Sequence, residues 1–180
     1  LYDYLEREGS VDVTDVFGQI AAGLRGMHAM GVAHLDLKLD NMLRDGTGCV
    51  RRCDLNMSRI VVTPDGTRLA IAECTGSLHY AAPEVLRPDT PYDGFRADVW
   101  SLGIILFLLL FRQFPFNDAQ DECPQYTLFK QLLTFGHPTC ALHHMYESKG
   151  WYRQAKIPEW VPDVLDFCLR PDPKSRGDLV

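Results

Sequence analysis

Apolar residues follow a helical spacing over much of this chain. Between about Val11 and Met30 they recur every three or four positions, and Gly31 marks a stop. The residues on this predicted face are Val13, Val16, Phe17, Ile20, Ala21, Leu24, Met27 and His28. The second half of the chain is also predicted to be helical, at about 96–112, 125–134 and 161–170. Helices therefore dominate the predicted fold, which is mainly α.

Short strands and turns are predicted between the first helix and the second. Residues 32–43 are apolar positions punctuated by polar ones, which indicates a loop with short strands. Asp45–Gly48 predicts a turn, and residues 50–56 predict another short strand. Residues 60–72 alternate loosely around Pro64-Asp-Gly66, which predicts a hairpin inside a long loop.

The most apolar stretch covers residues 102–111. It has about half of the roughly 20 residues that a membrane-spanning helix needs, so we expect a buried core helix and no membrane span. With 46% hydrophobic and 23% charged residues, the composition is that of an ordinary soluble domain. A length of 180 residues fits one domain with a sizeable core.

Charge and cysteine content narrow the function classes. The net charge of −6 argues against a general nucleic-acid-binding protein, which normally carries a basic excess. The six cysteines form no CxxC pair and no dense framework, a pattern typical of a reduced, intracellular protein. The chain starts without a signal-peptide pattern. We therefore expect a cytoplasmic location, with the nucleus as an open alternative.

Five short motifs carry the candidate chemistry. They are, in order, His34-Leu-Asp-Leu-Lys-Leu-Asp-Asn41, Cys53-Asp-Leu-Asn56, Ala82-Pro-Glu84, Asp98-Val-Trp-Ser-Leu-Gly103 and Asp172-Pro-Lys-Ser-Arg176. In order and spacing they resemble the catalytic loop, the metal-binding DFG position, the APE motif, the central helix and a C-terminal motif of eukaryotic protein kinases. A lysine two residues after the catalytic aspartate is typical of the serine/threonine type. The apolar run 107–118 is similar to the calcium/calmodulin-dependent and AMP-activated branch.

The resemblance implies ATP and Mg²⁺ as cofactors and assigns a role to four polar residues. Phosphoryl transfer needs an attacking hydroxyl held in line and charge stabilisation on the transferred phosphate. Asp36 would orient the hydroxyl of a protein serine or threonine and accept its proton. Lys38 would neutralise the phosphate. Asn41 and Asp54 would bind Mg²⁺ through hard oxygen atoms.

The resemblance also implies roles for less polar and structural residues. Leu43 would form the floor beneath the adenine ring, although core packing alone would also explain a leucine there. Cys53 would face the nucleotide pocket. Asp98 would cap the backbone of the catalytic loop from the central helix. Glu84 and Arg176 would form a buried ion pair between the APE motif and the C-terminal helices.

The chain departs from the family pattern at three positions. Leu35 replaces the arginine that normally binds a phosphate on the activation segment, here residues 54–84. Glu73 aligns with the usual phosphorylation site, so we expect activity that does not need phosphorylation there. Asn56 replaces a glycine, and asparagine tolerates a positive φ better than most residues. Asp54 is kept, so these changes are compatible with catalysis.

The motifs cover the chain but not the whole of a kinase domain. Residues 1–180 contain no glycine-rich loop, strand lysine or partner glutamate. We therefore expect a partial kinase domain, the C-terminal lobe, which alone binds ATP weakly and transfers phosphate negligibly. The alternative is a pseudokinase or scaffold lobe that binds protein partners without catalysis. A glycine-rich loop upstream in the full-length protein would favour the enzyme.

Acidic residues near the catalytic loop indicate a substrate preference. Asp40 stands where kinases that favour basic substrates often carry a glutamate, and further acids follow at Asp118, Asp121 and Glu122. These residues suggest substrates with arginine or lysine before the target serine or threonine. A solvated acidic face is an equally good explanation of the same residues.

Overall fold

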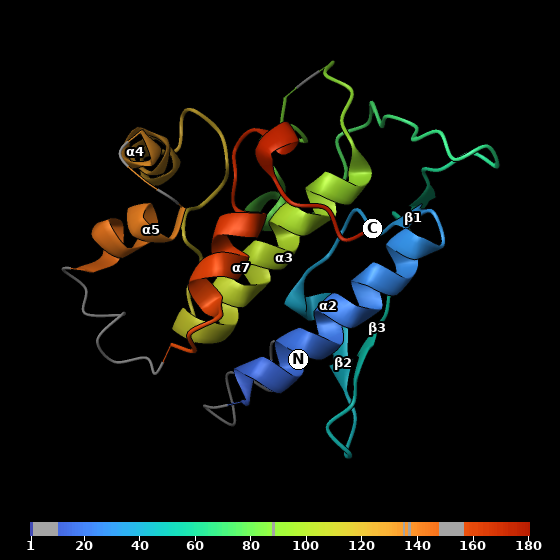
Figure 1. Cartoon of the computed structure of the whole chain (residues 1–180), viewed down its shortest axis with the longest axis horizontal. Coiled ribbons are helices and arrows are strands. Elements are labelled where there is room, and N and C mark those ends of the chain that lie inside the picture. The colour runs from blue at the N-terminus through green and yellow to red at the C-terminus, as the bar shows by residue number, and fades with distance from the viewer. Residues whose placement is uncertain (2–10, 88, 135, 137, 148–156) are drawn as a thin grey trace.

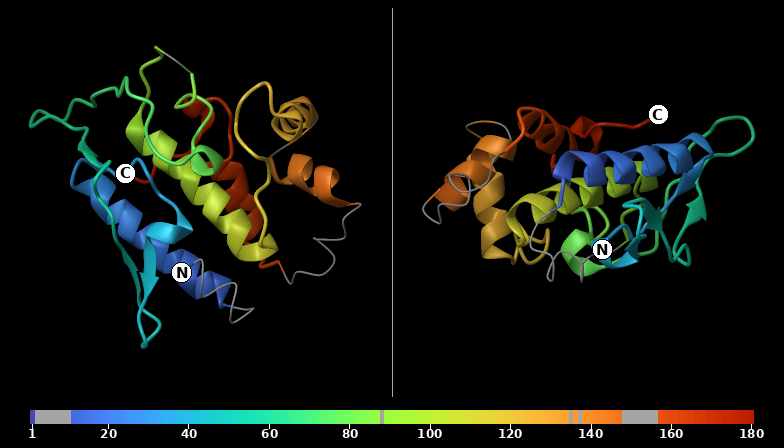
Figure 2. Two further views of the ribbon diagram at one scale, coloured as in Figure 1. Left: turned by 180° about the vertical axis from the view of Figure 1, so that it is seen from behind. Right: turned by 90° about the horizontal axis from the view of Figure 1, so that it is seen from below.

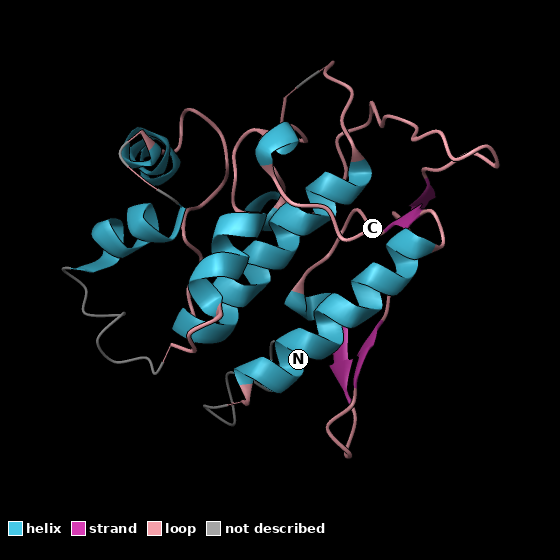
Figure 3. Ribbon diagram, viewed as in Figure 1, coloured by secondary structure: helices cyan, strands magenta, loops and turns pink. Residues whose placement is uncertain are grey.

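The computed structural model describes residues 1, 11–87, 89–134, 136, 138–147 and 157–180, and helices dominate it (Figures 1 and 3). The helices are α2 (Val13–Ala29), α3 (Gly94–Phe111), α4 (Pro124–Leu133), α5 (Pro138–Tyr146) and α7 (Val161–Cys168). The strands are β1 (Val32–Ala33), β2 (Met42–Arg44), β3 (Val50–Arg52) and β4 (Arg59–Ile60). The predicted mainly α fold with a few short strands is thus confirmed for the described residues.

Helix α3 forms the centre of the core. It lies between α2 and α7 (Figure 1), and both pack against it. All of its residues except Arg96 and Leu110 are buried. By length and composition, α3 is the one helix in the described part of the chain that could cross a membrane, but 89% of that apolar window is buried inside the fold. The prediction of a buried core helix is therefore confirmed.

Helix α2 packs on the central helix through the face that the sequence predicts. Six of the eight residues on that face are buried: Val16, Phe17, Ile20, Leu24, Met27 and His28. The helix begins after Asp12, whose side chain accepts a hydrogen bond from the backbone N–H of Asp15 at 3.1 Å. Backbone hydrogen bonds from Met30 and Gly31 close its C-terminal end, and Gly31 has a φ of 77°.

The strands form two separate two-stranded antiparallel ribbons. Strand β1 pairs with β4, and strand β2 pairs with β3. The predicted hairpin around Pro64 is present as a turn closed by an isolated bridge between Val62 and Arg68. Seen from behind and from below, these ribbons and the long loop lie to one side of the helices (Figure 2).

Two helices differ from the sequence prediction. Helix α5 is not among the predicted helices; it has only nine residues and packs against α4 and α7. Tertiary packing, and not local propensity, stabilises such short helices, so the sequence alone gives little signal for it. Helix α7 ends at Cys168, two residues earlier than predicted.

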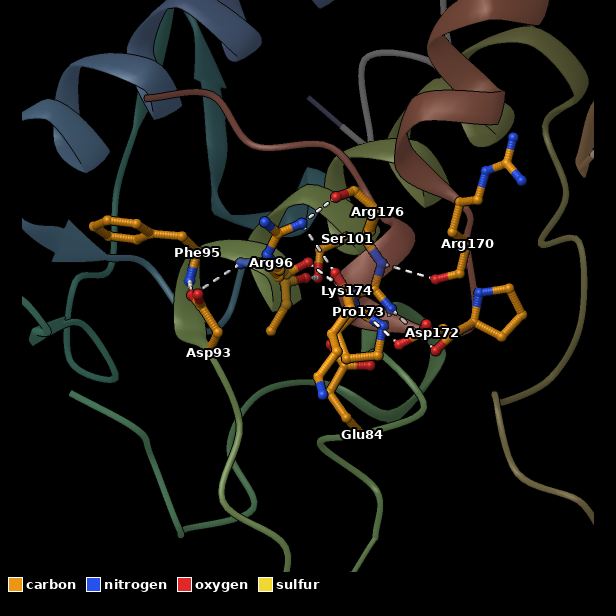
Figure 4. Close-up of polar contacts among 12 residues, drawn as sticks. Glu84, Asp93, Phe95, Arg96, Ser101, Arg170, Asp172, Pro173, Lys174 and Arg176 are labelled. Carbon is orange, nitrogen blue, oxygen red and sulfur yellow. Dashed lines mark hydrogen bonds and ion pairs between the residues drawn. The ribbon is translucent and has the colours of Figure 1, made fainter. Parts of the chain in front are cut away.

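A buried ion pair ties the C-terminal segment to the motif at Ala82–Glu84 (Figure 4). Both nitrogens at the end of the Arg176 guanidinium donate to the Glu84 carboxylate, at 2.6 and 3.0 Å. Arg176 also donates to the carbonyl oxygens of Arg96 and Arg170, and its guanidinium lies over the Trp100 ring. The two side chains are 0% and 6% exposed, so this predicted contact is present and shielded from water.

We predict that Glu84→Ala in the full-length protein lowers the free energy of unfolding by about 3–5 kcal/mol, because it leaves the Arg176 charge buried and unpaired. Urea denaturation measures the change. Glu73→Ala is the control: its side chain is 75% exposed, so we expect a change within about 0.5 kcal/mol. Equal stability of the two variants would contradict the assigned role of the pair.

Candidate active site

A carboxylate from the central helix shapes the loop that carries the catalytic motif. Asp98 is 1% exposed and accepts hydrogen bonds from the backbone N–H groups of His34 and Leu35, at 2.7 and 2.8 Å. His28 on α2 contacts the same carboxylate, with Nε2 2.9 Å from Oδ2. Because a carboxylate only accepts, Nε2 of His28 carries the proton. The predicted capping of the loop by Asp98 is therefore present in the structure.

The capped loop holds one residue in an uncommon conformation. Leu35 has a φ of 67°, in the left-handed region that costs a non-glycine residue roughly 1–2 kcal/mol. Its N–H is bound by Asp98, and its side chain is buried. Next to it, burial lowers the pKa of His34, an effect that the Asp98 carboxylate opposes. His34 is therefore neutral, and the hydrogen bonds to Asp98 hold this part of the loop in a fixed position before Asp36.

Three side chains of this loop, those of Asp36, Lys38 and Asn41, meet a fourth from a distant part of the sequence, that of Ser77. Asp36 Oδ2 lies 2.8 Å from Lys38 Nζ, and its Oδ1 accepts a hydrogen bond from the Ser77 hydroxyl at 2.8 Å. Lys38 donates to the same hydroxyl at 2.8 Å. The Asn41 amide nitrogen donates to Asp36 at 3.1 Å. Asp36 and Lys38 remain 12% and 22% exposed, so the cluster is fixed but open to a reactant.

Two residues offer oxygen atoms that suit a magnesium ion. The amide nitrogen of Asn41 faces Asp36, which leaves its Oδ1 as the atom able to bind a cation. Asp54 is exposed, and the N–H of its neighbour Cys53 donates to the Asn41 carbonyl at 2.9 Å, which joins the two segments. Among the described residues no three His, Cys, Asp or Glu side chains gather as a metal site. One carboxylate and one amide fit Mg²⁺, whose other ligands are usually phosphates and water.

The two residues expected beside the adenine ring lie at the surface of a ribbon. Leu43 on β2 is 56% exposed and therefore contributes little to the core, which disfavours core packing as its reason. Cys53 follows β3 and is half-buried. The pairing of β2 with β3 places both segments in one ribbon.

Sequence reasoning missed one partner in the activation segment. Leu35 replaces the arginine of the family pattern, but Arg59 on β4 lies 3.7 Å from the Glu73 carboxylate. The side chains are 47% and 75% exposed, and ion pairs of this kind contribute little to stability. Because the contact joins residues 14 positions apart across a loop, no local sequence pattern indicates it.

The activation segment also touches the catalytic loop through its backbone. Gly76 has a φ of 86°, and a Cβ atom added there would lie 2.5 Å from the carbonyl oxygen of Leu35. No L-residue with a side chain fits that approach without a shift of the backbone. The glycine therefore lets the chain pass directly against Leu35 and places the next residue, Ser77, on Asp36 and Lys38.

Comparisons with known proteins agree with the motifs. The model of the protein kinase domain family matches residues 1–179. CBL-interacting protein kinase 4 of Oryza sativa subsp. japonica is 46% identical over 168 residues, which cover 89% of this chain and 31% of the relative. The serine/threonine-protein kinase chk1 of Schizosaccharomyces pombe is 38% identical over 135 residues, covering 73% of this chain and 26% of the relative.

A third relative is also named as a serine/threonine kinase. A probable serine/threonine-protein kinase of Saccharomyces cerevisiae, KCC4, is 40% identical over 165 residues, which cover 92% of this chain and 14% of the relative. The chain thus spans between 14% and 31% of the length of these three relatives.

We predict that Gly76→Ala in the full-length protein detaches the activation segment from the catalytic loop. Limited proteolysis between residues 60 and 80 should become about tenfold faster, because a clash of this size exceeds the cost of a positive φ alone. Gly66→Ala is a matched control: Gly66 has the same φ of 86°, but an added Cβ meets nothing within 4 Å. Equal cleavage rates for the two variants would show that the contact with Leu35 does not hold the segment.

Proposed function

The chain belongs to the protein kinase family, with serine/threonine kinases among its relatives, and we propose that the protein carrying it transfers the γ-phosphate of ATP to a serine or threonine hydroxyl. The observation that carries this proposal is the cluster of Asp36, Lys38, Asn41 and Ser77. Two loops far apart in sequence contribute to it, and a buried helix fixes one of them.

Asp36 is positioned to act on the attacking hydroxyl. Its carboxylate is held from three sides, by Lys38, Asn41 and Ser77, which limits its rotation. A carboxylate fixed in this way can accept a hydrogen bond from a substrate hydroxyl and take its proton as the bond to phosphorus forms. Such positioning accounts for much of the rate enhancement in phosphoryl transfer.

Lys38 supplies a positive charge next to the same carboxylate. Its ammonium group has three donors, two of which are used by Asp36 and Ser77. The third can bind an oxygen of the transferred phosphate, where it would offset the negative charge of the transition state. Ser77 keeps the ammonium group and the carboxylate in a fixed relative position, because its hydroxyl bonds to both.

The cofactors proposed are ATP and Mg²⁺. Asn41 and Asp54 would hold the ion, which when bound offsets the negative charge of the phosphates. Leu43 would contact the adenine ring with its exposed side chain, and Cys53 would line the same pocket. Residues 1–180 would then form the C-terminal lobe of the kinase domain. Leu43 and Cys53 would face the part of the protein that closes over ATP.

A preference for basic substrates is proposed on charge alone. Asp40 is exposed within the catalytic loop, and Glu122 is exposed further along the chain. The carboxylate of Asp121 is already bound to Lys130, which weakens its part in the proposed acidic face. Asp40 is therefore the residue that most directly supports arginine or lysine before the target serine or threonine.

We predict that Asp36→Asn in the full-length protein lowers the rate of phosphate transfer to a serine-containing peptide at least about 100-fold, because asparagine cannot accept the proton. Transfer of labelled phosphate measures the rate. Asp40→Asn is the control: it removes a nearby exposed carboxylate, and we expect a rise of KM for basic peptides with kcat unchanged. Equal transfer by wild type and Asp36→Asn would exclude the proposed activity.

A further inference from the structure

Tyr92 is a buried side chain to which neither the motifs nor the proposed mechanism gives a role. It lies two residues before α3 and is 5% exposed. Its backbone forms an isolated antiparallel bridge with Ile71 of the activation segment, with hydrogen bonds of 2.8 and 2.9 Å in the two directions. The residue is therefore fixed to the core on one side and to the activation segment on the other.

The phenol of Tyr92 binds the activation segment a second time. It donates to the carbonyl oxygen of Glu73 at 3.0 Å, and the hydroxyl of Thr75 lies 2.8 Å from its oxygen. Because a phenol has one proton and gives it to Glu73, the Thr75 hydroxyl is the donor in the second bond. Burial raises the pKa of Tyr92, so the phenol keeps its proton at neutral pH.

The two residues that the Tyr92 hydroxyl binds, Glu73 and Thr75, come directly before the residues that contact the catalytic loop. Thr75 is followed by Gly76, which lies against the Leu35 carbonyl, and by Ser77, which binds Asp36 and Lys38. A shift of Thr75 would therefore move the hydroxyl that holds the catalytic carboxylate. Tyr92 anchors the segment one residue before that contact begins.

The hydrogen bonds of Tyr92 to the activation segment involve no charged group, whereas the family pattern has an arginine that binds a phosphate on this segment. In place of the arginine stands Leu35, whose side chain is buried. A Cβ added at Gly94 would lie 2.8 Å from Ile71 Cδ1 and 3.1 Å from Leu35 Cδ2, so both side chains fill the space beside that glycine. Apolar packing and the neutral bonds of Tyr92 thus connect the activation segment to α3 and the catalytic loop without a phosphate.

We propose that Tyr92 is a positioning residue for phosphate transfer: its buried hydroxyl holds Glu73 and Thr75 so that Ser77 orients Asp36 and Lys38. This inference rests on the proposed kinase function. It explains how the segment is held although Leu35 cannot bind a phosphate. The ion pair of Arg59 and Glu73 is exposed to solvent, and such pairs contribute too little free energy to hold the segment in place.

Steady-state kinetics of Tyr92→Phe in the full-length protein test the proposal. The variant keeps the ring and loses both hydrogen bonds, so we expect kcat with a serine peptide to fall about tenfold, KM for ATP to stay unchanged and Tm to fall by only a few degrees. Tyr126→Phe is the matched control, since Tyr126 is 1% exposed and its ring packs against Trp100, Phe116 and Phe129. It should match the wild type in kcat.

A second variant separates positioning from general stability. Thr75→Val should lower kcat in the wild type but have no further effect in the Tyr92→Phe background, because the two side chains share one bond. If wild type is active and Tyr92→Phe has its kcat within twofold, or if the two substitutions act additively, the positioning role is excluded. If wild type transfers no more phosphate than Asp36→Asn, the proposed function fails, and this inference fails with it.

Discussion

The carboxylate of Asp98 is the interaction on which the candidate site depends. It is buried on the central helix, and an unpaired charge there would be costly, so it requires donors. Two of these are the backbone N–H groups of His34 and Leu35, and the third is His28 on α2. One side chain thus joins α3, α2 and the catalytic loop. It also stabilises the left-handed conformation of Leu35, after which the chain turns to present Asp36.

The activation segment is fixed to the same helical core at two points. Near its middle, Tyr92 and Gly76 hold it against the start of α3 and the catalytic loop. At its C-terminal end, Glu84 is bound by Arg176 in a bidentate pair that water does not reach. Between these two points lies Ser77, the residue that contacts both Asp36 and Lys38. The position of the Asp36 carboxylate therefore follows from contacts with the buried core.

The parts of this structure that could be predicted from sequence are those with a local pattern or a family motif. Spacing of apolar residues located α2, and the apolar run at 102–111 indicated α3. The motifs indicated the capping by Asp98 and the pair of Glu84 with Arg176. Helix α5 and the contact of Arg59 with Glu73 were missed, because packing between distant segments determines them. The contacts of Tyr92 were missed for the same reason, since its hydroxyl bonds to residues 17 and 19 positions away.

Hydrogen exchange at the backbone amides of His34 and Leu35 tests the central claim most directly, because Asp98 is the acceptor for both. In Asp98→Asn the acceptor charge is lost. The account predicts that exchange of these two amides becomes about 100-fold faster, whereas amides in the middle of α3 keep their protection. Unchanged protection of His34 and Leu35 in a folded Asp98→Asn protein would contradict the account.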